Sequence, residues 1–274
     1  MPELPEVETI VSDLRPHLLG RVFARCEMLF PAIVRYPAPQ LFADAIAGLK
    51  VESVGRRGKF ILLGCGDGIL LVVHLGMTGQ LRIVDPIQPL VKHTHVVLAL
   101  DDGRHLRYTD PRRFGRLLLG REDELVAAKA MPLLGPEPID PHFAPDQMYG
   151  RLHRRRTSLK AVLLDQSAIA GVGNIYADES LHRAKLRPDR LAGSVSRVGA
   201  RRLHESLRET LSTAIENRGS SVDTYRDAWG EPGAQQEKLL VYGRAGQPCY
   251  TCGRRLSAIR IAGRTTVFCR RCQR

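Results

Sequence analysis

The sequence predicts an α+β protein of several domains, and three observations support this fold class. The first half carries short β-type runs divided by turn residues, the second half becomes helical, and two C-x2-C pairs lie near the C-terminus. The 274 residues are enough for one large or two ordinary domains with real hydrophobic cores.

A helix is predicted at residues 5–19, directly after the sequence MPEL. Pro5 suits a first helical turn, and Glu6 and Glu8 complement the positive end of the helix dipole. Apolar residues then recur at helical spacing until Gly20. This helix leads the chain into its β-rich part.

Between residues 51 and 119 the pattern changes to short strands with tight turns. The runs are FILLGC, ILLVVHL, QLRIV, HVVLAL and RLLLG, separated by signals such as GDG and DDG. Many short strands joined in this way predict a two-sheet sandwich or a flattened barrel.

The second half of the chain is predicted to be mainly helical. It follows a proline-rich linker, PLLGPEPIDPHFAPD. Helices are expected in TSLKAVLLDQ, in NIYADESLHRAK after the turn GVG, and at residues 196–217. The polar segment that follows Gly219 has little periodicity and is expected to be a mobile loop.

The net charge of +12 is unevenly distributed. Residues 1–150 contain 17 Lys and Arg against 18 Asp and Glu, whereas residues 151–274 contain 24 against 11. Such a distribution is typical of a polyanion-binding domain joined to a neutral one, although a merely basic, soluble surface would look the same. No apolar run is long enough to span a membrane, and no secretory signal is present, so we expect a cytoplasmic protein.

Four of the six cysteines have the spacing of a metal site. Two C-x2-C pairs are separated by 16 residues, which predicts one structural zinc ion bound by four thiolates: Cys249, Cys252, Cys269 and Cys272. Two disulfides are the alternative, and they are disfavoured in the cytoplasm.

Several long motifs together resemble bacterial formamidopyrimidine-DNA glycosylases. They are MPELPEVETI, RRGKF, HLGMTG, DPRRFG, GVGNIYADESL and the four-cysteine module, and they span the whole chain in order. The resemblance implies an N-terminal β-sandwich with a leading helix (residues 1–131), a linker (132–149), a helix–two-turn–helix domain with a lesion-capping loop (150–238) and a zinc-finger hairpin (239–274). It also implies base excision repair by a bifunctional glycosylase and abasic-site lyase that acts on oxidised purines.

The resemblance assigns the chemistry to the start of the chain. After removal of Met1, the secondary amine of Pro2 is the expected Schiff-base nucleophile, and an α-amine has a pKa of about 8, so part of it is neutral at physiological pH. Glu3 is then the proton donor to the sugar ring oxygen as the ring opens, with Glu6 as a supporting carboxylate. Lys59 and Arg264 are expected to donate protons during β- and δ-elimination. Without the resemblance, an ordinary helix start would explain the same residues.

The resemblance also assigns contacts with damaged double-stranded DNA. Met77, Arg112 and Phe114 match residues that fill the space left by an extruded base, an event that costs about a few kcal/mol. Ordinary core packing is the alternative for the two apolar ones. Asn174 follows GVG at a predicted helix N-terminus, which favours phosphate binding. The remaining implied contacts are His74, His93, Arg156, Lys160, Ser220 and Tyr225.

The loop at residues 219–238 departs from the family pattern at one step. Ala234 and Gln235 occupy positions where many members carry aromatic residues. This departure bears on loop closure and lesion preference. Two other functions remain open beside the one that the resemblance implies: an endonuclease VIII-type glycosylase for oxidised pyrimidines, and a non-catalytic zinc-containing DNA-binding protein. No signal for a dimer or a protein partner is visible, so we expect a monomer.

Overall fold

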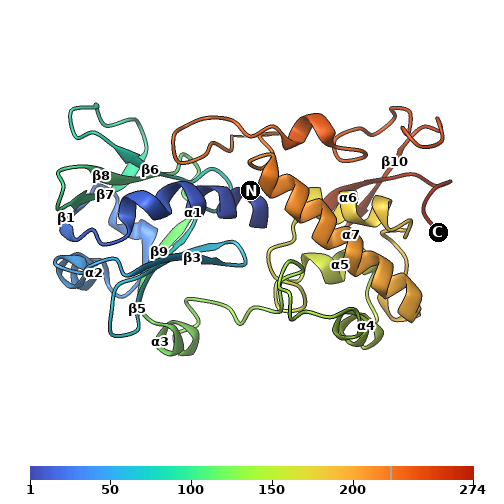
Figure 1. Cartoon of the computed structure of the whole chain (residues 1–274), viewed down its shortest axis with the longest axis horizontal. Helices are drawn as coiled ribbons and strands as arrows, with labels where there is room; N and C mark the ends of the chain where they lie inside the picture. Colours follow the sequence, from blue (N-terminus) through green and yellow to red (C-terminus); the bar gives the residue numbers. More distant parts are fainter. Residues whose placement is uncertain (223) are drawn as a thin grey trace. The chain divides into compact units, whose positions relative to one another are not determined.

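A computed structural model describes residues 1–222 and 224–274 of the chain. Asp223, which belongs to the predicted capping loop, lies outside the described residues. The chain forms two compact units (Figure 1). The first contains residues 1–133 and 217–234, and the second contains residues 134–216 and 235–274.

The first unit is a sandwich of two sheets, as the sequence predicts. One sheet has the strand order β1-β7-β8-β6, and the other has the order β2-β9-β5-β4-β3. The strands are β1 (Phe23–Met28), β2 (Val34–Tyr36), β3 (Ser53–Arg57), β4 (Phe60–Gly64), β5 (Ile69–His74), β6 (Gln80–Val84), β7 (Thr94–Leu100), β8 (His105–Thr109) and β9 (Arg116–Arg121). All neighbouring strands are antiparallel except β2 and β9, which are parallel.

The helices of the first unit follow from local sequence signals. α1 (Leu4–Leu18) buries Val7, Ile10 and Val11 and packs against β3, β4 and β6. Prolines begin the short elements η1 (Pro31–Ile33) and α2 (Pro39–Ile46), and α3 (Glu122–Ala127) follows β9 directly.

The second unit contains helices and a two-stranded hairpin. Its elements are α4 (Pro145–His153), α5 (Leu159–Leu164), α6 (Asn174–Arg183), η2 (Ala192–Ser194), α7 (Arg197–Glu216), η3 (Gln235–Lys238), β10 (Ser257–Ile261) and β11 (Arg264–Phe268). Cys269 directly follows β11, and the zinc module and the helices belong to one unit. No helix in the described part of the chain is long and apolar enough to cross a bilayer.

The division into units differs from the predicted domain boundaries in two places. Residues 217–234 were expected with the helical domain, but they pack with the sandwich, where Tyr225 and Ala228 join the hydrophobic core. The predicted linker at residues 132–149 is not wholly irregular, because α4 begins inside it at Pro145. Pro145 suits a first helical turn, which explains why a proline-rich stretch can end in a helix.

Candidate active site and DNA-binding residues

The predicted nucleophile and acid lie at the start of α1. Pro2 and Glu3 are both buried, and Glu3 is the N-cap residue of the helix. The backbone N–H of Glu3 donates a 2.8 Å hydrogen bond to Glu6 Oε2, one turn along. The hydrogen bonds within the helix provide no acceptor for this N-cap amide, and Glu6 provides one. The contact also fixes the direction in which the chain enters the helix.

The second carboxylate oxygen of Glu6 reaches a distant segment. Glu6 Oε1 accepts a 2.7 Å hydrogen bond from the backbone N–H of Ser220. Gly219 adopts φ +77°, and a Cβ there would lie 2.9 Å from Glu6 Cγ and from Oε1. Only glycine fits this approach, which explains the helix stop that the sequence predicts at this residue. The structure therefore brings Ser220 to the same carboxylate as Glu3.

Tyr225, further along the same segment as Ser220, also contacts Glu6. Its hydroxyl donates a 3.4 Å hydrogen bond to the Glu6 carbonyl oxygen, and its side chain is buried. Burial, reinforced by the nearby Glu6 charge, raises the pKa of Tyr225 above its usual value, so the phenol is neutral.

Lys59 lies in the turn between β3 and β4, and its side chain is buried. Gly58, at φ +57°, makes this tight turn possible. The neighbouring Arg56 ties the hairpin to α1 through a 2.9 Å ion pair with Glu8. RRGKF thus places a buried lysine in the β3–β4 turn, and both of these strands pack against α1.

His74, at the end of β5, is held as a neutral ring. Its Nδ1 accepts a 3.2 Å hydrogen bond from the Gly76 N–H, and Phe60 packs 4.8 Å away between ring centroids. Burial lowers the pKa of His74 to about 4, and the positive charges of Arg116 and Lys59 act in the same direction. A contact of His74 with DNA would therefore be a neutral hydrogen bond and not an ion pair.

Two turns present the predicted void-filling residues. Phe114 is 57% exposed, and the Arg112 guanidinium lies 4.8 Å from the centre of its ring. Met77 belongs to the neighbouring turn, where a Cβ on Gly76 would lie 2.5 Å from backbone atoms of Phe114 and Gly115. The two turns are therefore packed backbone against backbone, and the structure brings Met77, Arg112 and Phe114 together.

A fully buried carboxylate, Asp110, organises these turns. Its oxygens accept hydrogen bonds from the Gly115 N–H at 2.8 Å, the Arg112 N–H at 3.2 Å and the Thr78 hydroxyl at 2.5 Å. The Asp110 N–H donates to the carbonyl of His93, which is partly exposed at φ +68°. His93 thus borders the same pair of turns.

In the second unit, the β10–β11 hairpin carries Arg264 and contacts Asn174. Asn174 is the first residue of α6, and its Nδ2 donates a 3.2 Å hydrogen bond to the Thr265 carbonyl. Arg264 is exposed at the start of β11, after a turn in which Ala262 and Gly263 have positive φ. Arg156 is also exposed, in the connection before α5.

Lys160 has a different environment from the one the resemblance implies. Its side chain is 0% exposed, and Nζ forms a 2.6 Å ion pair with Asp178 Oδ1, which is equally buried. Nζ also donates a 2.8 Å hydrogen bond to Thr266 Oγ1. Lys160 therefore supports the hairpin that carries Arg264 from beneath and does not reach the surface in this structure.

The four predicted zinc ligands converge. Their sulfur atoms all lie within 4.8 Å of one another, with Sγ–Sγ distances of 3.9 Å for Cys249–Cys272 and 3.5 Å for Cys252–Cys269. A tetrahedral zinc with Zn–S bonds of about 2.3 Å requires sulfur atoms about 3.8 Å apart. The site fits zinc, and because four thiolates leave no open position, the ion is structural.

Sequence profiles of known families match the chain in three places. The N-terminal domain of formamidopyrimidine-DNA glycosylase matches residues 1–117, and its H2TH (helix–two-turn–helix) domain matches residues 134–226. A zinc finger found in FPG and IleRS matches residues 246–274. The chain belongs to the formamidopyrimidine-DNA glycosylase family. Its enzymatic activity is therefore that of a DNA glycosylase in base excision repair.

Relatives in this family are similar over their full lengths. The formamidopyrimidine-DNA glycosylase of Herpetosiphon aurantiacus is 46% identical, with all of both chains covered, and that of Desulforamulus reducens is 45% identical, covering 100% of this chain and 99% of the relative. The MutM (Fpg) protein of Thermus thermophilus superposes with a TM-score of 0.89 at 44% identity, covering 99% and 98% of the two chains. The Lactococcus lactis Fpg in complex with DNA containing an abasic site superposes at 0.91 with 34% identity, covering 99% of both chains.

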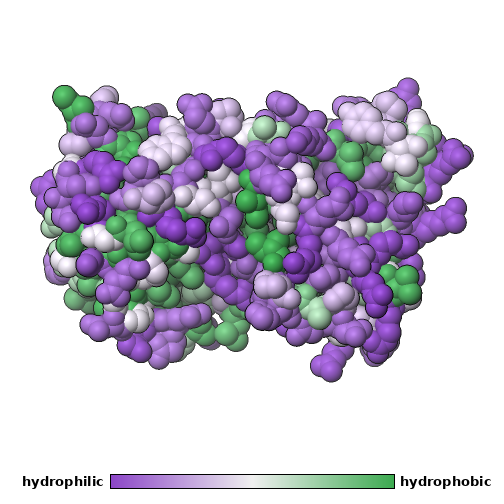
Figure 2. Space-filling view, in the orientation of Figure 1, coloured by the Kyte–Doolittle hydropathy of each residue, from purple (hydrophilic) through white to green (hydrophobic). Residues whose placement is uncertain are grey.

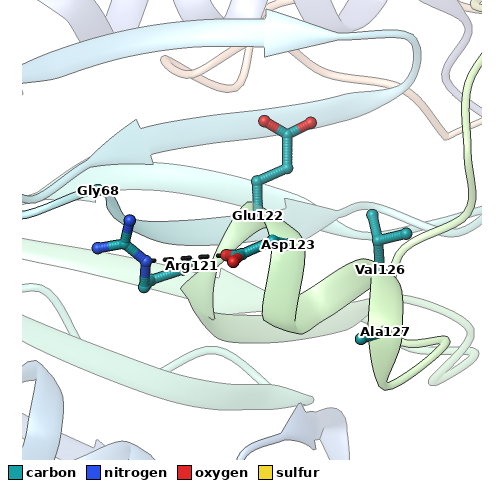
Figure 3. A pocket seen from close by; sticks show the side chains of 6 residues that line it. All are labelled: Gly68, Arg121, Glu122, Asp123, Val126 and Ala127. Carbon is teal, nitrogen blue, oxygen red and sulfur yellow. Dashed lines mark ion pairs between the residues drawn. The ribbon is translucent and has the colours of Figure 1, made fainter.

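A hollow in the sandwich unit is separate from all predicted site residues. It lies beside α3 and is lined by Gly68, Arg121, Glu122, Asp123, Val126 and Ala127 (Figure 3). Arg121 points toward Asp123 at 3.7 Å and also donates to the Asp67 carbonyl at 2.7 Å. Because both charges of this pair are largely exposed, the hollow offers no desolvated group for chemistry.

Sequence reasoning missed the buried acids that hold the functional segments. Asp110 stands in the quoted motif DPRRFG, yet only its neighbours were assigned a role. Asp178 and Glu179 stand in GVGNIYADESL, and Glu179 accepts the backbone N–H groups of Leu240, Val241 and Tyr242 at 2.8–2.9 Å. Two adjacent acids inside the quoted motif were an available signal, since buried acids require partners.

Proposed function

We propose that this glycosylase releases oxidised purines, such as 8-oxoguanine and formamidopyrimidines, from double-stranded DNA and then cuts the strand. The observation that most supports the proposal is the start of α1, where Pro2 and Glu3 are buried and Glu6 holds the Glu3 amide. Relatives from Lactococcus lactis have been solved with Fapy-dG DNA and with abasic-site DNA, which supports the same substrate class.

The chemistry begins once Met1 has been removed. The neutral amine of Pro2 attacks C1′ of the deoxyribose, while the bond from C1′ to the base breaks and the base takes up the proton that the amine loses. Glu3 protonates the ring oxygen as the sugar opens, which leaves an iminium between Pro2 and C1′. The iminium acidifies the C2′ hydrogens, so the 3′ and then the 5′ phosphate can be eliminated, with Lys59 and Arg264 as proposed proton donors.

Other residues hold the opened duplex. Met77, Arg112 and Phe114 are proposed to fill the space of the extruded base, because they project from two rigid turns and Phe114 is exposed. His74 and His93 border these residues, and Ser220 and Tyr225 are proposed to lie over the base. Arg156, Asn174 and Arg264 are proposed phosphate contacts, whereas the buried Lys160 acts through the hairpin.

Much of the face seen in Figure 2 is hydrophilic, with apolar patches between the polar side chains. We propose that the enzyme works on DNA as a monomer in the cytoplasm. Sedimentation of the chain with and without duplex DNA would test the oligomeric state.

Borohydride trapping tests the chemistry. The mature enzyme, with Met1 absent by mass spectrometry, should form a covalent complex with duplexes that carry 8-oxoguanine or an abasic site. A chain with an acetylated Pro2 amine should form none, although it should still bind the abasic duplex. A preference for oxidised pyrimidines over oxidised purines would support the endonuclease VIII-type alternative, and full activity with a blocked amine would refute the nucleophile.

A further inference from the structure

An arginine outside the predicted site connects the 217–234 segment to the catalytic helix. Arg218 Nη2 lies 2.7 Å from Asp13 Oδ2 on α1 and 2.6 Å from Asp227 Oδ2. Both carboxylates are largely buried, with side-chain exposures of 9% and 3%. One guanidinium therefore bridges two desolvated acids, a stronger arrangement than an exposed surface pair. We call Arg218, Asp13 and Asp227 the clamp.

The clamp also closes a turn further along the segment. Asp227 Oδ1 accepts the backbone N–H groups of Trp229 and Glu231, each at 2.9 Å. The Trp229 ring meets His17 of α1 edge-on, with the centroids 5.0 Å apart, and the Trp229 carbonyl accepts a 2.9 Å hydrogen bond from Arg82 of β6. The distal part of the segment is thus fixed to both α1 and the sandwich.

The start of the segment has an anchor of its own. Arg218 and Gly219 both have positive φ, +59° and +77°, and together they turn the chain so that the Ser220 amide meets Glu6. This contact is independent of the clamp, because it uses a backbone amide and a different acid. Loss of the guanidinium should therefore leave Glu6 and the Glu3 amide in place and release only the distal anchor.

We propose that Arg218, Asp13 and Asp227 are positioning residues that hold Ser220 and Tyr225 over the target base. The inference rests on the proposed function. A clamp of this kind matters for release of a base, which the segment must cover, and not for cleavage at an abasic site, which has no base to cover. Misplacement of a positioning element by about 1 Å can lower a rate by about 100-fold.

The sole tryptophan of the chain provides a readout that is independent of catalysis. Trp229 lies inside the clamped turn and is 44% exposed. In Arg218→Met, which removes the guanidinium and keeps most of the stem, acrylamide should quench its fluorescence more strongly. Arg218→Lys should restore part of the protection. Arg197→Met removes a comparable guanidinium from an exposed pair with Asp146 in the other unit and should change nothing.

The same variants are then compared on two duplexes. We expect Arg218→Met to release 8-oxoguanine about 10- to 100-fold more slowly under single-turnover conditions and to nick the abasic duplex within about twofold of the wild-type rate. Unchanged base release, or an equal loss on both duplexes, would overturn the proposal. If the wild-type enzyme acts on neither duplex, the proposed function fails, and unchanged quenching of Trp229 in Arg218→Met would then still refute the clamp.

Discussion

Replacement of Lys160 by methionine should destabilise the second unit in a pH-dependent manner. The substitution keeps an unbranched apolar stem, with sulfur in place of Cδ, and removes the ammonium group. Asp178, which is 0% exposed, then loses a 2.6 Å ion pair, and Thr266 loses a 2.8 Å hydrogen bond. Removal of one partner from a buried pair typically costs about 3–5 kcal/mol, because the other charge remains buried.

Protonation of Asp178 limits this cost. An aspartate with an unfolded pKa of about 3.9 can be neutralised at pH 7 for about 4 kcal/mol, and at pH 5 for about 1.5 kcal/mol. The wild-type protein already carries part of this cost, since burial raises the pKa of Asp178 to about 6 against the opposing effect of Lys160. Lys160→Met should therefore lower the free energy of unfolding at pH 7 by between about 1 and 4 kcal/mol. An acid with a raised folded pKa loses stability as pH rises, so the variant should approach the wild type at pH 5.

Urea unfolding at pH 5 and pH 7, followed by circular dichroism, measures this difference. The double variant Lys160→Met, Asp178→Asn removes both charges of the buried pair and should recover most of the loss at pH 7. Arg187→Met breaks an exposed pair with Asp189 and should cost less than about 1 kcal/mol at either pH. An equal loss at both pH values for Lys160→Met would show that packing, and not the buried charge, sets its effect.

Three further predictions concern the zinc site, Asp110 and His74. Chelation should release one zinc ion per chain, measured by elemental analysis, and should lower the unfolding temperature, because binding by four thiolates contributes directly to folding. Asp110→Asn should lower the free energy of unfolding by about 1–3 kcal/mol and weaken DNA binding in a filter assay, since the Gly115 and Arg112 amides lose a charged acceptor. An unchanged affinity would show that these turns do not contribute to DNA binding. Because the folded pKa of His74 is lowered to about 4, stability should fall by up to about 3 kcal/mol as pH drops from 6.5 to 4, and His74→Gln should lose that part of the pH dependence.

Local sequence patterns were sufficient to predict many of the helices and strands and the zinc site. The leading helix, the five quoted strand runs and the last long helix all appear within about two residues of their predicted bounds, because apolar spacing and turn residues act over a few positions. The C-x2-C pairs were equally informative, since each pair forms one compact metal-binding turn. Residues 21–50 gave no comparable signal, although they form β1, β2 and α2.

Long-range contacts explain what the sequence could not predict. Residues 217–234 follow a helix of one unit but pack with the other, because Arg218 pairs with Asp13 near the start of the chain and Ser220 meets Glu6. Lys160 in RTSLK has the pattern of a surface lysine, and only the fold reveals that Asp178 lies beside it. The spacing of residues along the sequence identifies neither Asp13 as the partner of Arg218 nor Asp178 as the partner of Lys160.

Buried carboxylates provide a common physical explanation for how the functional segments are positioned. Backbone amides that no helix or sheet partner accepts need another acceptor once they are buried. Here the acceptors are acids: Glu6 for the amides of Glu3 and Ser220, Asp110 for those of Arg112 and Gly115, Asp178 for that of Val267, Glu179 for those of Leu240 to Tyr242, and Asp227 for those of Trp229 and Glu231. Charged acceptors bind amides about twice as strongly as neutral ones, which suits turns that must keep Phe114 or Arg264 exposed and correctly oriented. The predicted reactive and DNA-contacting side chains are thus held largely by residues that would not themselves touch DNA.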